Sequence, residues 1–191
     1  QYPKAIAYHM KCLKIYEELD HKTGISGAYN NIGIIYAAME KKEQALEYYK
    51  KAVAIEEKHG DPVNVSIMTN NIGTIYRKLR NYPEAINYFE KSLGIAKKIG
   101  YKRGMSRALV NLGIATEGRK QYEKALEYYR QALDINTAIK HTFGIAVDHH
   151  AIGALYIHMK DYGAAAKHLE KARDLAKKIG MKELLRDCYD N

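Results

Sequence analysis

The sequence predicts an all-α protein built from repeated pairs of helices, and two observations lead to this prediction. Within each repeat the apolar residues follow helical spacing, and no alternation of period two is long enough for a strand. Glycine and alanine also recur every 40 residues, which indicates one supersecondary unit stacked on its copies. The recurring residues are Gly33, Gly73, Gly113 and Gly153, and Ala45, Ala85, Ala125 and Ala165.

Each unit contains two helical stretches that are joined by a polar hinge. In the first unit these stretches are residues 28–36 and 45–53. The second stretch places its apolar residues at i, i+4, i+7 and i+8, which is one face of a helix. We therefore expect each unit to fold as a helix A, a turn and a helix B.

The starts of helix B carry capping signals. Asn81 and Asp161 each offer a side-chain oxygen at the N-cap position. Pro83 stands near the first helical position, where its missing N–H does no harm. These residues predict helix starts close to 82 and 162.

The ends of helix B are marked by glycine. Gly60, Gly100 and Gly180 follow last turns that contain lysine, which predicts a left-handed C-terminal cap at each. Lys140 stands at the same place in the third unit. We expect a less sharp helix ending there.

The glycine inside helix A needs a physical reason, because it costs roughly 1 kcal/mol relative to alanine. A sequence repeats that cost only where a side chain would clash. The alanine twelve positions later is the natural partner, so we expect Gly33 to lie against Ala45. These glycines and alanines are interpreted as structural.

The domain organisation predicted is a single array over residues 1–191, cut from a longer protein. Residues 2–6 are in register with residues 82–86, so the first segment is interpreted as helix B of a partial unit. The segments are 1–20 (partial), 21–60, 61–100, 101–140 and 141–180 (full repeats), and 181–191 (the start of a further helix A).

Both cut ends are expected to expose apolar surface, because no capping unit is present. Self-association through these ends is therefore predicted. The residues expected to mediate it are Tyr8, Ile15, Leu184 and Leu185.

Composition and net charge exclude some classes of binding partner. The net charge is +9, but the lysines occur mostly as solvated pairs between glutamates, and no basic run is dense enough to follow phosphates. We therefore expect no nucleic acid partner. No apolar run approaches 18 residues, so no membrane partner is expected. Cys12 and Cys188 cannot form a disulfide framework, which fits a reducing compartment and a cytoplasmic location.

Gly33, Tyr36, Ala45, Tyr49 and Ala52 resemble the signature of the tetratricopeptide repeat, and matching residues recur in phase in four units. Thr116 departs from the pattern at the tyrosine of helix A. The resemblance implies a right-handed α-solenoid of antiparallel helix pairs. The 40-residue repeat is similar to the long-repeat class of Pins-type scaffolds, kinesin light chains and bacterial signalling proteins.

The resemblance also implies a concave groove lined by helices A, with inward residues at the second, fifth, ninth and twelfth positions of each unit. Such a groove binds an extended or helical peptide. Asn30 and Asn70 are the leading candidates, because an amide both donates and accepts hydrogen bonds, although both could be plain solvated amides. The candidate groove residues are Asn30, Ile34, Asn70, Thr74, Arg77, Arg107, Ile114, Glu117, His150 and Ile157.

Two features of the candidate groove indicate which classes of ligand it could bind. Arg77 and Arg107 could bind a carboxylate, or could instead form salt bridges within the array. The chaperone-binding members of the family carry asparagine at the ninth position of helix A, where this chain has Ile34, Thr74, Ile114 and Ala154. Chaperone C-termini are therefore not expected as ligands.

No catalytic or cofactor constellation is present in the sequence: we find no Ser-His-Asp order, paired-carboxylate site, Gly-rich phosphate loop or Cys-x-x-Cys pair. His149, His150 and His158 raise a metal site, but the i+4 slot between the last two is Ala154, and His149 falls on a core position. We expect no metal, no cofactor and no catalytic residue.

The function predicted is a non-enzymatic module that binds a peptide or partner protein in the groove. The alternative is a sensory or regulatory input domain of a larger bacterial signalling protein, such as a kinase or a transcription regulator. An enzymatic function, for example a phosphatase, is the third possibility, for which no catalytic set is found.

Overall fold

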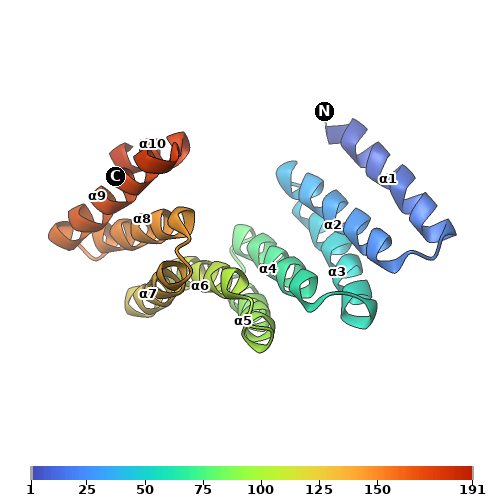
Figure 1. The fold of residues 1–191 in the computed structure, drawn as a ribbon, viewed down its shortest axis with the longest axis horizontal. Coiled ribbons are helices and arrows are strands. Elements are labelled where there is room, and N and C mark those ends of the chain that lie inside the picture. The colour runs from blue at the N-terminus through green and yellow to red at the C-terminus, as the bar shows by residue number, and fades with distance from the viewer. Residues whose placement is uncertain (1, 191) are drawn as a thin grey trace. The chain divides into compact units, whose positions relative to one another are not determined.

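The computed structural model describes residues 2–190, and side chains as far as Cys188; expectations for Gln1 and Asn191 lie outside these residues. The described residues form α-helices and no strand (Figure 1). The helices are α1 (Tyr2–Glu18), α2 (Lys22–Ala38), α3 (Lys42–His59), α4 (Pro62–Lys78), α5 (Tyr82–Lys98), α6 (Lys102–Glu117), α7 (Tyr122–Ala138), α8 (Thr142–His158), α9 (Tyr162–Ile179) and α10 (Lys182–Asp190).

The chain divides into two compact units, residues 1–101 with α1 to α5 and residues 102–191 with α6 to α10. Within each unit every helix packs against the next, and successive helices run in opposite directions (Figure 1). The even-numbered helices are the predicted helices A, and the odd-numbered helices are the predicted helices B. The prediction of an all-α fold built from antiparallel helix pairs is confirmed.

The repeated alanines are the centre of the core. Ala45, Ala85 and Ala125 are fully buried, and Ala165 is 3% exposed. Ala45, for example, packs in one cluster with Ile72 of the next helix A. Small side chains at these positions let neighbouring helices approach closely, which accounts for the alanine period.

The sequence predicts that each repeated glycine of helix A lies against the alanine twelve positions later, but the nearest contact is a different residue in every repeat. Only Gly73 also approaches its alanine, since a Cβ atom built on it would lie 3.2 Å from the Ala85 carbonyl oxygen. A Cβ atom built on Gly33 would meet the Tyr49 ring at 2.8 Å, and one on Gly113 would meet the Tyr129 ring at 2.3 Å. Phe89 and Leu169 take this place for Gly73 and Gly153. The partner is therefore the large side chain sixteen positions later, which lies across the face of the glycine.

The predicted caps at the start of helix B are confirmed. The Asn81 side chain accepts a hydrogen bond from the Glu84 N–H at 3.4 Å, and the Asp161 carboxylate accepts one from the Ala164 N–H at 3.0 Å. Pro83 occupies the second position of α5. These contacts satisfy amide groups that have no partner inside the helix.

The helix ends differ from the prediction at two positions. Gly100 and Gly180 adopt left-handed conformations, with φ of 68° and 72°, as expected. Gly60 does not: its φ is −113°, and a Cβ atom there would overlap the buried carboxylate of Glu56. Lys140 takes the left-handed conformation (φ 54°), so its helix ends as sharply as those that end in glycine.

Replacement of Lys140 by glycine is expected to stabilise the protein by about 0.5–1 kcal/mol, because a side chain in the left-handed region is strained and glycine is not. The His141 N–H still reaches the Asn136 carbonyl at 2.9 Å, so the cap itself is kept. Urea unfolding of the variant measures the gain. Lys140→Ala removes the same long side chain but keeps Cβ, and equal stabilisation by both variants would contradict this explanation.

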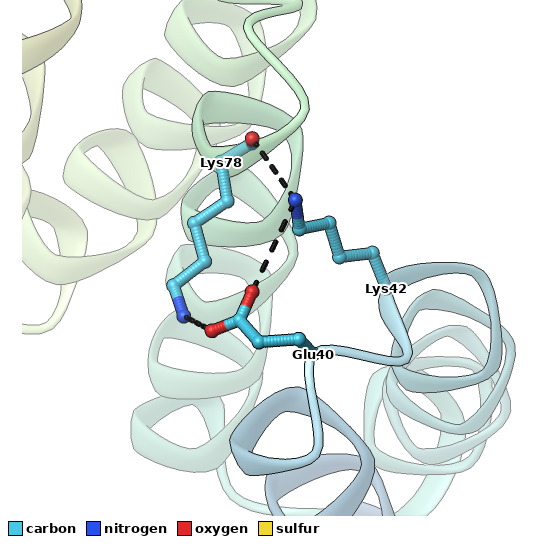
Figure 2. Close-up of polar contacts among 3 residues, drawn as sticks. All are labelled: Glu40, Lys42 and Lys78. Atoms are coloured by element: carbon cyan, nitrogen blue, oxygen red, sulfur yellow. Dashed lines mark hydrogen bonds and ion pairs between the residues drawn. The ribbon is translucent and has the colours of Figure 1, made fainter.

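The turn between α2 and α3 contacts the end of α4 through exposed charges (Figure 2). The Lys78 ammonium donates to Glu40 Oε1 at 2.9 Å, and the Lys42 ammonium lies 3.9 Å from Glu40 Oε2 and 3.4 Å from the Lys78 carbonyl. The hydrogen bond from Lys78 holds the pKa of Glu40 below its usual value. Such exposed ion pairs orient a turn but contribute little stability.

The two ends of the chain expose different amounts of apolar surface. Tyr8 and Ile15 on α1 are 69% and 53% exposed, as expected for an uncovered face. Leu184 is not exposed, because it packs on Ala146 and Ala176. Self-association stays a prediction, and α1 is the surface that carries it. No helix within the described range has the length and apolar character that a membrane crossing requires.

Candidate functional site

A cavity of about 350 Å³ lies within the second unit, between α6, α7 and α8. Helix α6 contributes its first three turns, α7 contributes Asn136 near its end, and α8 contributes its first two turns. The volume is in the range of small-molecule and peptide-anchor sites. The lining residues are Arg103, Ser106, Arg107, Val110, Asn111, Asn136, His141, Phe143, Gly144, Val147 and Asp148.

Three buried polar residues form the wall of this cavity. The side-chain amide of Asn136 donates to Ser106 Oγ and to Asp148 Oδ2, each at 2.6 Å. Gly144 makes room for that amide, since a Cβ atom there would lie 2.5 Å from it. Both N–H groups of Asn136 are therefore used, and its orientation is fixed.

Asp148 is the least satisfied member of this group. The residue is 1% exposed, and its Oδ1 is buried without a hydrogen-bond partner. Burial raises the pKa of Asp148 to about 7, and the hydrogen bond from Asn136 opposes that rise only in part. A buried carboxyl with a free oxygen is costly, and such groups occur where a ligand or a reaction uses them.

Basic side chains lie around the same cavity. Arg103 and Arg107 are exposed residues of α6, and neither has an ion pair with an acidic side chain among the described residues. His141, which is 3.3 Å from Asn136 Oδ1, has a lowered pKa because of burial and the charge of Arg103. The cavity thus combines a buried acid with exposed guanidinium groups and the apolar side chains of Val110, Phe143 and Val147.

The predicted groove residues are divided between the two units. Asn30 and Ile34 lie on α2, and Asn70, Thr74 and Arg77 lie on α4, whereas the other five are in the second unit. Arg107 alone among the ten lines the cavity. The four predicted groove residues of the second unit that do not line the cavity are Ile114, Glu117, His150 and Ile157.

In the first unit, two predicted residues retain unsatisfied atoms. Asn30 Oδ1 and Arg77 Nε are buried and have no hydrogen-bond partner. Asn70 is 4% exposed, so it is not a solvated amide. The Thr74 hydroxyl donates to the carbonyl of Asn70 at 3.1 Å and is therefore occupied within its own helix.

Two predicted groove residues of the second unit are engaged in the fold. Glu117 accepts a hydrogen bond from the Tyr129 hydroxyl at 2.7 Å, and its other oxygen lies 3.5 Å from His158 Nε2. Ile114 packs on the core around Tyr129 and Ile152. These contacts explain both residues structurally, without a ligand.

The histidines considered for metal binding lie in separate places. His149 is a buried core residue, as predicted, and its Nδ1 lies 3.0 Å from Nδ1 of His168. Burial lowers the pKa of His149 to about 4, with a further contribution from His168. In the part of the chain that the structure describes, no three His, Cys, Asp or Glu side chains are grouped for a metal ion.

Family models of the tetratricopeptide repeat match most of the chain. A tetratricopeptide repeat model matches residues 1–58 and 64–138, and a second tetratricopeptide repeat model matches residues 149–179. No curated protein matches the chain.

Solved structures share this fold at low identity. The aspartyl phosphate phosphatase F of Bacillus subtilis has a TM-score of 0.91 at 18% identity, covering 99% of this chain and 50% of that protein. BtubC of P. vanneervenii has a TM-score of 0.82 at 19% identity, covering 94% and 75%. The Rap conjugation gene regulator of the plasmid pLS20, in complex with the Phr* peptide, has a TM-score of 0.77 at 19% identity, covering 96% and 51%. The chain thus spans about half the length of the phosphatase and of the regulator.

Proposed function

Because the chain belongs to the tetratricopeptide repeat family, we propose that it is a non-enzymatic module that binds a peptide or partner protein along its helices A. One observation carries the proposal. Among the described residues, every buried side-chain polar atom without a hydrogen-bond partner lies on a helix A. These atoms are Asn30 Oδ1 on α2, Thr69 Oγ1 and Arg77 Nε on α4, and Asp148 Oδ1 on α8.

Each such atom costs roughly 1–3 kcal/mol when it is buried without a partner. Helices B contain none among the described residues, although they bury Glu56, Ser92 and Asn136, each of which has a hydrogen-bond partner. A bound peptide offers backbone N–H and C=O groups at regular spacing. These groups can form hydrogen bonds with unsatisfied acceptors and unsatisfied donors alike. The distribution therefore supports a ligand surface on helices A rather than on helices B.

The comparisons support the same function by analogy of fold. The pLS20 regulator is a Rap protein in complex with the Phr* peptide, and its fold is similar to that of this chain. An enzymatic function is not favoured, because the hydrogen-bonded group at the cavity (Ser106, Asn136 and Asp148) contains no base that is hydrogen-bonded to a nucleophile.

Selection of a random peptide library on the protein, followed by titration of the selected peptides, tests the proposal. Asn30→Ala combined with Asn70→Ala is expected to weaken binding of selected peptides at least tenfold, because two hydrogen bonds to the peptide backbone are lost. The matched control is Asn31→Ala with Asn71→Ala, which changes the neighbouring amides. Unfolding curves of both double variants check that the fold is retained.

Unchanged affinity in the Asn30/Asn70 variant would place the ligand elsewhere on the module. Failure to select any peptide with the wild-type protein would contradict peptide binding itself.

The alternative function is a sensory or regulatory input domain of a larger signalling protein. The similarity to a conjugation gene regulator favours this alternative specifically. The reading frame on either side of this chain tests it, since an adjoining kinase or DNA-binding part is expected.

A further inference from the structure

We propose that the cavity between α6, α7 and α8 binds the free amino end of a peptide with an acidic residue at its first or second position, with the ammonium group on Asp148 and the carboxylate on Arg103 and Arg107. This inference rests on the proposed function, because it names the part of the peptide that one site on helices A receives.

Asp148 occupies a repeat position that is apolar in the other three full repeats. The equivalent residues of the other units are Ala28, Met68 and Ala108, and all three are buried core residues. The fold therefore requires a small or apolar side chain here, and aspartate is the exception. Its position beside a cavity gives the exception a use.

Only one oxygen of the Asp148 carboxyl group has a hydrogen-bond partner. Its Oδ2 accepts the hydrogen bond from Asn136, but Oδ1 has no partner, although Asp148 lines the cavity. Because Oδ1 is buried, it reaches a ligand only when the whole carboxyl group turns about its broad Cβ–Cγ torsion. An ammonium group supplies both the missing hydrogen-bond donors and the missing positive charge.

Two positively charged side chains of α6 line the same cavity. Arg103 and Arg107 line the cavity and form no ion pair with an acidic side chain among the described residues. Two guanidinium groups together favour a carboxylate. A ligand that binds both the Asp148 carboxylate and these guanidinium groups within about 350 Å³ must carry its cation and its anion close together.

An amino terminus next to an acidic residue has this compact arrangement. A lysine side chain does not, because its ammonium group stands at the end of a long apolar stem without an adjacent anion. Free acidic amino acids present the same chemistry, and the experiment must separate the two sources. Val110, Phe143 and Val147 offer apolar contact to the neighbouring side chain.

The test uses the whole chain and a pooled set of C-terminally amidated dipeptides in which glutamate is first or second. Titration is followed by NMR of the backbone amides of residues 143–148. We expect shifts at these residues with a Kd of ~1 mM or tighter for at least one dipeptide. Acetylation of the amino end should weaken that binding at least tenfold, and glutamine in place of glutamate should weaken it severalfold. Free L-glutamate is expected to bind more weakly than the dipeptide.

Two variants locate the binding. Asp148→Asn keeps the shape of the side chain and is expected to weaken binding at least tenfold, and Asp148→Ala, which copies Ala28 and Ala108, should do the same. Asp134→Asn changes an exposed acid on α7 and serves as the control. Arg103→Gln with Arg107→Gln is expected to abolish the preference for glutamate over glutamine.

The proposal is overturned if no dipeptide shifts these amides, if acetylated and free dipeptides bind equally, or if both Asp148 variants bind as the wild type does. Stronger binding of free L-glutamate would assign the cavity to an amino acid and overturn the peptide source. Peptides selected from the random library that bind independently of their amino end would leave the proposed function intact. Conversely, dipeptide binding without any selected peptide would contradict only the general module.

Discussion

Gly113→Ala is expected to lower the free energy of unfolding by about 3 kcal/mol, one of the largest effects of a single methyl group in this protein. The new Cβ would lie 2.3 Å from Cε1 of Tyr129. That ring cannot move aside easily, because Tyr129 is 1% exposed and its hydroxyl donates to Glu117 at 2.7 Å. The clash must therefore separate α6 from α7. Urea unfolding followed by circular dichroism measures the loss.

Gly94→Ala is the matched control for this prediction. Gly94 lies inside α5, and a Cβ atom there would meet nothing within 4 Å. Alanine is therefore expected to stabilise by about 1 kcal/mol, through helix propensity alone. The two variants should change stability in opposite directions. A similar loss of stability in both variants would mean that replacing any helical glycine destabilises the protein, and that contact with Tyr129 is not the cause.

The glycine period is an instructive case of what sequence predicts. The spacing of 40 residues correctly indicates helix pairs in which a side chain on helix A would clash. It does not identify the partner, because alanine twelve positions later and a large residue sixteen positions later repeat with the same period. Only the crossing of the two helices decides which of them faces the glycine, and that depends on packing along the whole pair.

The helix ends illustrate a similar limit. Glycine at the last position predicts the left-handed cap correctly at Gly100 and Gly180, but Gly60 adopts φ of −113° because the Glu56 carboxylate accepts the Asp61 N–H at 3.0 Å. Lys140 adopts the left-handed conformation without glycine. Stacking of the units fixes the chain direction at each end, and the local residue then tolerates the required backbone angle.

The candidate site was predictable only in part. Resemblance to the repeat family places Arg107 on the inward side of helix A, and the structure places it at the cavity. Asp148 was missed because it stands outside the four inward positions. The signal that could have found it is the repeat register itself, in which an acid replaces Ala28, Met68 and Ala108. Its interaction with Asn136 spans two helices and has no counterpart in the sequence pattern.

Burial of the Asp148 carboxyl group lowers the stability of the folded protein at neutral pH. Its pKa is about 7 when folded, compared with 3.8 in the unfolded chain. Between these values the folded state binds a proton that the unfolded state does not, so this group makes stability fall as pH rises from about 4 to about 7. The full loss, on the order of 4 kcal/mol, is present above pH 7.

His149 changes the free energy of unfolding in the opposite direction over almost the same pH range. Its pKa is about 4 when folded, compared with 6.5 when unfolded. Below 6.5 the unfolded state binds a proton that the folded state does not, so this group makes stability fall as pH falls toward 4. The two neighbouring residues therefore largely cancel, and their joint contribution to the pH dependence of the wild type is small.

Asp148→Asn removes one side of this balance. The free energy of unfolding of the variant minus that of the wild type is expected to increase by about 1.4 kcal/mol per pH unit between pH 4 and pH 7, and to stay constant above pH 7. Denaturant titrations at about pH 4.5, 5.5, 6.5 and 7.5 measure this difference, in which the titration of every other group cancels. Asp134→Asn, at an exposed acid, should give a flat difference. A flat difference for Asp148→Asn as well would mean that the Asp148 carboxyl is already ionised and satisfied in the folded protein. A ligand ammonium group in the cavity would then find no unsatisfied carboxylate oxygen to bind.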